Sequence, residues 1–228
     1  MNSPDKFVEA LSGVRLANSF NPYKDTCPIH DTPDAAERRK ENLKLCLEAC
    51  IEDGADTIWI ARDLGYRGGR RTGIALTDEA HLSDASAMYG GADLRRATNG
   101  PPVAERTATT TWGLLRAIGR PVMLWNVFPF HPHAPSDPMS NRCHKKSERE
   151  ATWPFMLALL EMLSPTKLVA IGRDAGLALS SLDVEVSTVR HPSYGGQAEF
   201  VAGVQGIYGL SPVAKPPEMA TLPFAEFA

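Results

Sequence analysis

Three polar residues of different chemistry stand directly after apolar stretches of the chain. Asp63 follows the apolar run at 57–61, Asn126 closes the run at 122–125, and His191 follows the run at 184–189. A carboxylate can stabilise positive charge or take a proton, a carboxamide can pair with a polar ligand edge, and an imidazole can donate a hydrogen bond. Each residue alone is more often an ordinary polar end of a strand. All three together favour a site.

A glycine-rich, basic segment at 65–73 follows Asp63. Residues 62–71 contain four arginines and one aspartate. Glycines allow close approach of the backbone, and guanidinium groups match phosphate oxygens. The segment has no Gly-Lys-Ser/Thr element, which excludes a Walker-type phosphate loop. A second basic run lies at 142–149. Either run is equally well explained as a solvated surface, but both lying beside the three polar residues would favour a phosphate backbone as partner.

The elements that must position these residues follow from the hydrophobic pattern. Short apolar runs at 57–61, 122–125, 168–171 and 184–189 predict strands, and the first three are nearly continuous, as in a parallel sheet covered on both faces. Helices are predicted at 107–118 and 147–163, after Asp174 and from about Ala198. The alternation indicates an α/β sandwich, in which ligands bind at the carboxyl ends of the strands. Asp63, Asn126 and His191 are therefore expected on one rim.

A further helix is predicted before the first strand. Its apolar residues recur at helical spacing: Leu43, Cys46, Leu47, Cys50 and Ile51. Asp34 with Glu37 predicts a capping pair at its start and Gly54 its end, while Ser147 with Glu150 predicts a capping box for the helix at 147–163. Residues 1–33 are expected to be loop, and the tail at 211–228 irregular.

Composition limits the class of protein. The 228 residues are 43% apolar and 22% charged, as expected for one globular domain over residues 1–228. No apolar run approaches the roughly 18 residues of a membrane span. The first residues lack the layout of a secretory signal, and four cysteines do not suggest a disulfide framework, so a cytoplasmic location is expected. The net charge of −3 gives no overall nucleic-acid footprint, although a local basic patch is enough.

The polar residues stand in a recognisable order. Ala-Arg-Asp-Leu-Gly at 61–65 resembles the Gly-Gln-Asp-Pro-Tyr or Gly-Ile-Asn-Pro-Gly motif of the uracil-DNA glycosylase superfamily, and His-Pro-Ser at 191–193 resembles its second motif. Asn126 stands where the superfamily has a base-reading asparagine, and the segment 73–77 resembles the one that supplies a stacking side chain. The resemblance covers residues 57–200. It implies a three-layer α/β/α sandwich on a four-stranded parallel sheet.

The resemblance also implies roles. Asp63 would stabilise the cationic sugar and orient or deprotonate water, and His191 would hydrogen-bond O2 of the departing base. The implied base-binding residues are Asn126, Leu76, Gly65 and Arg62, and the implied contacts to the DNA backbone are Ser193, Arg70, Arg71 and Tyr194. Tyr194 or Gln197 would fill the hole left by the flipped base. The expected activity is monofunctional excision of uracil in base excision repair, by a monomer that binds DNA and no membrane.

Departures from the superfamily pattern leave the substrate open. Leu64 replaces a proline, Gly65 replaces the tyrosine that refuses thymine, and Leu76 replaces an aromatic residue. Hypoxanthine, xanthine or mismatched thymine are therefore alternative substrates. A lesion-binding module without turnover and a hydrolase of free nucleosides are further alternatives.

No cofactor or metal is expected. The four cysteines do not have the spacing of the iron–sulphur branches of the superfamily. The short pairs of ligand-type residues are interpreted as surface or loop residues, because none forms a well-spaced set: Cys27 with His30, His131 with His133, and Cys143 with His144.

Overall fold

The computed structural model describes residues 1–211 and contains a four-stranded parallel sheet in the order β3-β2-β5-β6. The strands are β2 (Thr57–Asp63), β3 (Met123–Phe128), β5 (Lys167–Ile171) and β6 (Glu185–Val189). Ala61 pairs with Asn126 across β2 and β3, and Ile171 pairs with Val189 across β5 and β6. All four predicted strands are confirmed, and because they are parallel, their carboxyl ends meet at one edge.

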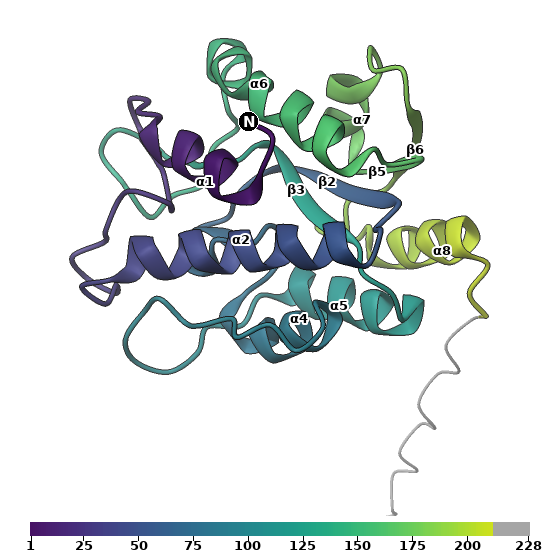
Figure 1. Cartoon of the computed structure of the whole chain (residues 1–228), viewed down its shortest axis with the longest axis horizontal. Coiled ribbons are helices and arrows are strands. Elements are labelled where there is room, and N and C mark those ends of the chain that lie inside the picture. Colours follow the sequence, from purple (N-terminus) through teal and green to yellow (C-terminus); the bar gives the residue numbers. More distant parts are fainter. Residues whose placement is uncertain (212–228) are drawn as a thin grey trace, which may run out of the picture.

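Helices cover both faces of this sheet, so the predicted three-layer α/β/α sandwich is confirmed. Figure 1 shows α6 and α7 on one side of the strands and α4 and α5 on the other. The helices of the described residues are α1 (Pro4–Gly13), α2 (Ala35–Glu52), α3 (Gly69–Thr72), the 3₁₀ helix η1 (Glu79–His81), α4 (Leu82–Met88), α5 (Arg106–Ile118), α6 (Lys146–Leu163), α7 (Arg173–Leu179) and α8 (Gln197–Tyr208). A small antiparallel pair joins β1 (Ser19–Phe20) to β4 (His131–Pro132).

The central strands are buried because their side chains are apolar on both faces. Every residue of β3 is buried, as are the first five residues of β2. Trp59 is fully buried and donates its indole N–H to the hydroxyl of Tyr208 on α8 over 2.8 Å. This hydrogen bond links α8, the last described helix, to the sheet. It also gives the buried indole N–H the acceptor that it needs.

Helix α1 lies in the segment predicted as loop, so that prediction is wrong. Ser3 caps the helix by accepting a hydrogen bond from the backbone N–H of Lys6, and Pro4 occupies the first turn. Phe7 and Leu11 are fully buried against the core. The Ser-Pro start and the i, i+4 pair of apolar residues were a readable signal for this helix.

Two details of capping differ from the prediction. Helix α6 begins at Lys146, and the carboxylate of Glu148 accepts from the backbone N–H of Lys145 over 2.6 Å, so the Ser147–Glu150 box is wrong. Asp34 stands at the start of α2 as predicted, but its side chain makes no cap hydrogen bond.

The two predictions for the far end of α2 have different outcomes. Gly54 lies just past that end with φ +63°, as predicted. Ile51, predicted on the buried face of the same helix, is 44% exposed.

Cys27, Cys46, Cys50 and Cys143 carry free thiols.

Among residues 1–211, none of the helices combines the length and apolar character needed to cross a membrane. The prediction of an irregular tail at 211–228 lies outside the described residues from 212 onward.

Candidate active site

A cleft of about 410 Å³ opens at the carboxyl edge of the sheet. It lies where the ends of β2 and β5, an inner residue of β3 and the loop after β6 converge. The cleft brings together eight of the eleven residues predicted for the site: Arg62, Asp63, Gly65, Leu76, Asn126, His191, Ser193 and Tyr194. Arg70, Arg71 and Gln197 are not among the lining residues.

Asp63 is the last residue of β2, and both of its carboxylate oxygens are held. Oδ2 accepts from Nε of Arg62 over 2.6 Å, and Oδ1 lies 2.5 Å from Nδ1 of His144. The Asp63 side chain is only 8% exposed. Each carboxylate oxygen has two acceptor positions, so Asp63 keeps room to accept from a water or to face a developing positive charge.

Arg62 connects Asp63 to the start of α7. Its Nη1 donates to Oδ2 of Asp174 over 2.6 Å. Burial alone would lower the pKa of Arg62, but the hydrogen bonds to Asp174 and Asp63 outweigh burial and raise it. The guanidinium is therefore a fixed cation at the cleft. These contacts occupy the side chain, and a contact from Arg62 to a base stays a prediction.

Asn126 is 1% exposed, and neither its Nδ2 nor its Oδ1 has a hydrogen-bond partner among the described residues. Leaving a buried polar group unpaired costs about 1–3 kcal/mol. Because Asn126 lines the cleft, a molecule in the cleft can supply both missing partners. A carboxamide offers that molecule one donor and one acceptor side by side.

His191 follows β6 and is poised as a neutral hydrogen-bond donor. The backbone N–H of Ser193 donates to its Nδ1 over 3.1 Å, and the Ser193 hydroxyl lies 2.7 Å from the same atom. Burial, and then the charges of Arg62 and Arg190, lower the pKa of His191. With Nδ1 accepting and the ring neutral, the proton resides on Nε2.

Two residues that line the cleft have left-handed backbones without being glycine. Leu76 has φ +57° and Tyr194 has φ +52°. Such a backbone costs on the order of 1–2 kcal/mol for a residue with a Cβ, and strain of this kind gathers at functional sites. Tyr194 is also 97% exposed, which leaves its ring free at the rim of the cleft.

Glu105 is a cleft residue that the sequence analysis missed. A Cβ placed on Gly65 would come within 3.9 Å of both Glu105 carboxylate oxygens. Oε1 accepts from the hydroxyl of Thr107 over 2.9 Å, and within the described part of the chain the carboxylate makes no ion pair. Glu105 precedes α5 directly, and only the packing of that helix brings it beside the end of β2.

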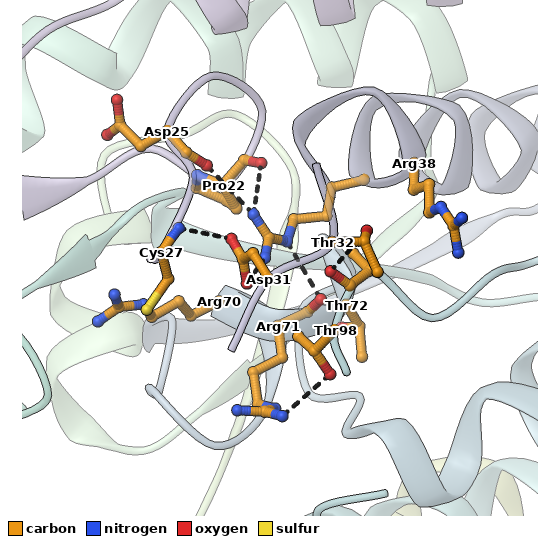
Figure 2. Close-up of polar contacts among 12 residues, drawn as sticks. Pro22, Asp25, Cys27, Asp31, Thr32, Arg38, Arg70, Arg71, Thr72 and Thr98 are labelled. Atoms are coloured by element: carbon orange, nitrogen blue, oxygen red, sulfur yellow. Dashed lines mark hydrogen bonds and ion pairs between the residues drawn. The ribbon is translucent and has the colours of Figure 1, made fainter. Parts of the chain in front are cut away.

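Arg70 and Arg71 are structural, so their prediction as contacts to a DNA backbone is wrong. They are 4% and 8% exposed. Arg71 pairs with Glu79 over 2.9 Å and donates to Thr98 over 3.0 Å, as Figure 2 shows for the second contact. The Arg70 guanidinium lies over the ring of Phe20, 4.1 Å from its centroid. Partners already satisfy these cations, and exposing them to phosphate would leave buried groups unpaired.

Other cations lie at the cleft instead. Arg173, at the start of α7, and Arg190, before His191, line it and are exposed. Guanidinium groups at a rim suit phosphate oxygens. Within residues 1–211, no group of three or more His, Cys, Asp or Glu side chains is arranged to hold a metal ion.

The comparisons with known proteins bear on the fold. The crystal structure of wild-type SMUG2 from Pedobacter heparinus is similar to this chain, with a TM-score of 0.62 and 14% identity over 92% of this chain and 97% of that one. At this identity the likeness shows the shared fold. No protein family matches the chain, and no curated protein does.

Proposed function

We propose that this chain is a DNA glycosylase that excises uracil from DNA by hydrolysing the N-glycosidic bond. The observation that carries the proposal is Asn126, whose buried and unpartnered amide shares one cleft with Asp63 and His191. The fold shared with SMUG2 is the one that the sequence resemblance to the uracil-DNA glycosylase superfamily implies, which supports the same reading.

Asn126 recognises the base in this proposal. A base inside a duplex is out of reach, so the nucleotide must flip into the cleft. Uracil presents N3–H as a donor and O4 as an acceptor, and one carboxamide satisfies both through Oδ1 and Nδ2. Cytosine presents the reverse pair, so the amide discriminates when its orientation is fixed.

Asp63 and His191 stabilise the two charges that develop as the bond breaks. The carboxylate of Asp63 faces the cationic sugar and accepts from the attacking water. A charge pair at about 4 Å is worth about 4 kcal/mol at an effective dielectric of about 20, or roughly a thousandfold in rate. Nε2–H of His191 donates to O2 of the base, where negative charge accumulates. A neutral imidazole suits this role because it donates a hydrogen bond to O2 without giving up its proton.

Water is the nucleophile in this scheme. Within residues 1–211, none of the residues that line the cleft is a lysine, so the proposal contains no Schiff-base step. Tyr194, exposed on a strained loop, fills the space that the base leaves. Arg173 and Arg190 contact the phosphates on either side.

A second candidate substrate is a deaminated purine. Gly65 leaves the wall of the cleft open where the strictest uracil enzymes of the superfamily carry a tyrosine. The Glu105 carboxylate beside Gly65 can accept a hydrogen bond from a purine ring N–H such as N1–H, which lies farther from the glycosidic bond than N3–H of uracil. Hypoxanthine and xanthine carry this N–H on a larger, two-ring base and therefore suit this wall.

A panel of oligonucleotides tests the proposal. Labelled strands bearing uracil, hypoxanthine, xanthine or a T:G mismatch are incubated with excess protein, and abasic sites are then cleaved with alkali. We expect the strongest cleavage at uracil. Cleavage at a purine alone selects the second candidate. Binding to uracil-containing DNA without any cleavage indicates a lesion-binding module, and release of uracil from free deoxyuridine alone indicates a nucleoside hydrolase.

A further inference from the structure

His144 makes the shortest contact to the carboxylate of Asp63 among the described residues. Nδ1 of His144 lies 2.5 Å from Oδ1 of Asp63, and the two side chains are 10% and 8% exposed. His144 precedes α6 and is 81 residues from Asp63 in the chain. A contact between buried side chains this far apart in sequence requires that both segments be held in place.

The ring of His144 is supported from the sheet. It lies against the ring of Phe128, with centroids 5.6 Å apart and planes inclined by 34°. Phe128 pairs with Asp63 across β2 and β3. The residue directly opposite the carboxylate therefore supports the imidazole, and packing restricts the ring to an orientation that points Nδ1 at Oδ1.

The backbone on either side of His144 is also fixed. Arg142 donates to both carboxylate oxygens of Glu148, over 2.8 and 2.6 Å, and to the backbone oxygen of Asn18 over 2.8 Å. Glu148 accepts in turn from the backbone N–H of Lys145. His144 lies in the chain between Arg142 and Lys145, the two residues that Glu148 holds. A paired guanidinium and carboxylate of this geometry gives directional as well as electrostatic restraint.

We propose that His144 is a positioning residue for Asp63. Its Nδ1–H donates to Oδ1 and, together with Arg62 on Oδ2, holds the carboxylate plane in one orientation. The remaining lone pairs of Asp63 then point into the cleft toward the sugar and the water. The proposal rests on the function proposed above, because the orientation of Asp63 matters for rate only if Asp63 acts on a substrate.

Three substitutions of His144 separate positioning from simple packing. An asparagine amide nitrogen can stand near the place of Nδ1, a glutamine amide nitrogen stands nearer Nε2, and alanine supplies no donor. We expect His144→Ala and His144→Gln to lower the single-turnover excision rate about 10- to 100-fold, and His144→Asn to recover most of it. Affinity for an oligonucleotide with an abasic site should stay within about twofold in all three. A rate for His144→Ala equal to the wild type, or no recovery in His144→Asn, overturns the proposal.

A spectroscopic measurement tests the contact without activity. In ¹⁵N-labelled wild-type protein, the Nδ1–H proton of His144 should resonate far downfield and should move upfield in Asp63→Asn. An unchanged ring signal overturns the contact. If the wild type excises no base from any oligonucleotide, the proposed function fails, and the ring signal alone then decides whether His144 holds Asp63.

Discussion

The backbone N–H of Ser193 donates to Nδ1 of His191 across 3.1 Å. This hydrogen bond, together with the lowered pKa of His191, leaves Nε2–H free to donate into the cleft. The bond comes from the backbone, so it survives most substitutions of the Ser193 side chain. The turn after β6 thereby determines which ring nitrogen of His191 carries the proton.

Replacing His191 should therefore cost more than replacing Ser193. We expect His191→Ala to lower single-turnover excision by about 10²- to 10³-fold, as for the loss of one donor to a developing oxyanion. Ser193→Ala keeps the backbone donor, and its loss should stay below about tenfold. Quench-flow excision of uracil measures both, and equal losses in the two variants would show that the hydroxyl, not the turn, orients the ring.

Asn126 should lower the stability of the folded protein, although the proposed activity depends on it. Asn126→Leu removes two unpaired buried polar atoms, and we expect the free energy of unfolding in urea to rise by about 1–2 kcal/mol while excision falls to background. Asn42 is the matched control, since it is also 1% exposed but bonds to Thr72 and Arg95. Asn42→Leu should lower the free energy of unfolding by about 1–3 kcal/mol. A loss of stability in Asn126→Leu would mean that the amide has a partner in the folded protein.

Substitutions of a buried and of an exposed arginine should have different effects, the first on stability and the second on DNA binding. Arg71→Ala removes the closer of the two ion pairs of the fully buried Glu79 and leaves only Arg96, at 3.5 Å, so it should lower the free energy of unfolding by about 3–5 kcal/mol. Arg190→Ala should unfold like the wild type. Its DNA affinity should fall less steeply with salt, by about one unit of the log–log slope. Fluorescence anisotropy at several salt concentrations measures that slope, and an unchanged slope removes Arg190 from the phosphate contacts.

Stability should fall in acid partly through His131. Burial, and then the charge of Arg70, lower the pKa of His131 to about 4. Between the ordinary histidine pKa of about 6.5 and this value, the unfolded chain binds a proton that the folded chain does not, so stability is lost as pH falls through this range. The loss approaches about 1.4 kcal/mol for each pH unit.

His131→Gln is the control for this effect. The variant lacks the titrating group, so its free energy of unfolding should depend less steeply on pH between 6.5 and 4 than that of the wild type. Urea titrations at half-unit steps of pH give the comparison, and parallel curves for the two proteins would count against His131.

The sheet and the three central site residues were readable from the sequence for one physical reason. Buried parallel strands are apolar on both faces, so the polar residues that follow each apolar run mark the end of a strand, and Asp63 and His191 are among them. Asn126 was readable because it follows the apolar run at 122–125, but it does not end the strand as predicted, since β3 continues past it to Phe128.

The partners of these residues were not readable. His144 and Glu105 come from segments whose position depends on tertiary packing. Arg70 and Arg71 look like surface cations in the sequence, because burial by Phe20, Glu79 and Thr98 arises only when distant segments meet.

Single-turnover excision from a uracil-containing oligonucleotide, compared between the wild type and Asp63→Asn, tests the proposed chemistry most directly. We expect the wild type to leave an alkali-sensitive site, and Asp63→Asn to do so about a thousandfold more slowly while remaining folded. Excision by Asp63→Asn at the wild-type rate would contradict the role of the carboxylate, and the absence of any excision by the wild type would contradict the function itself.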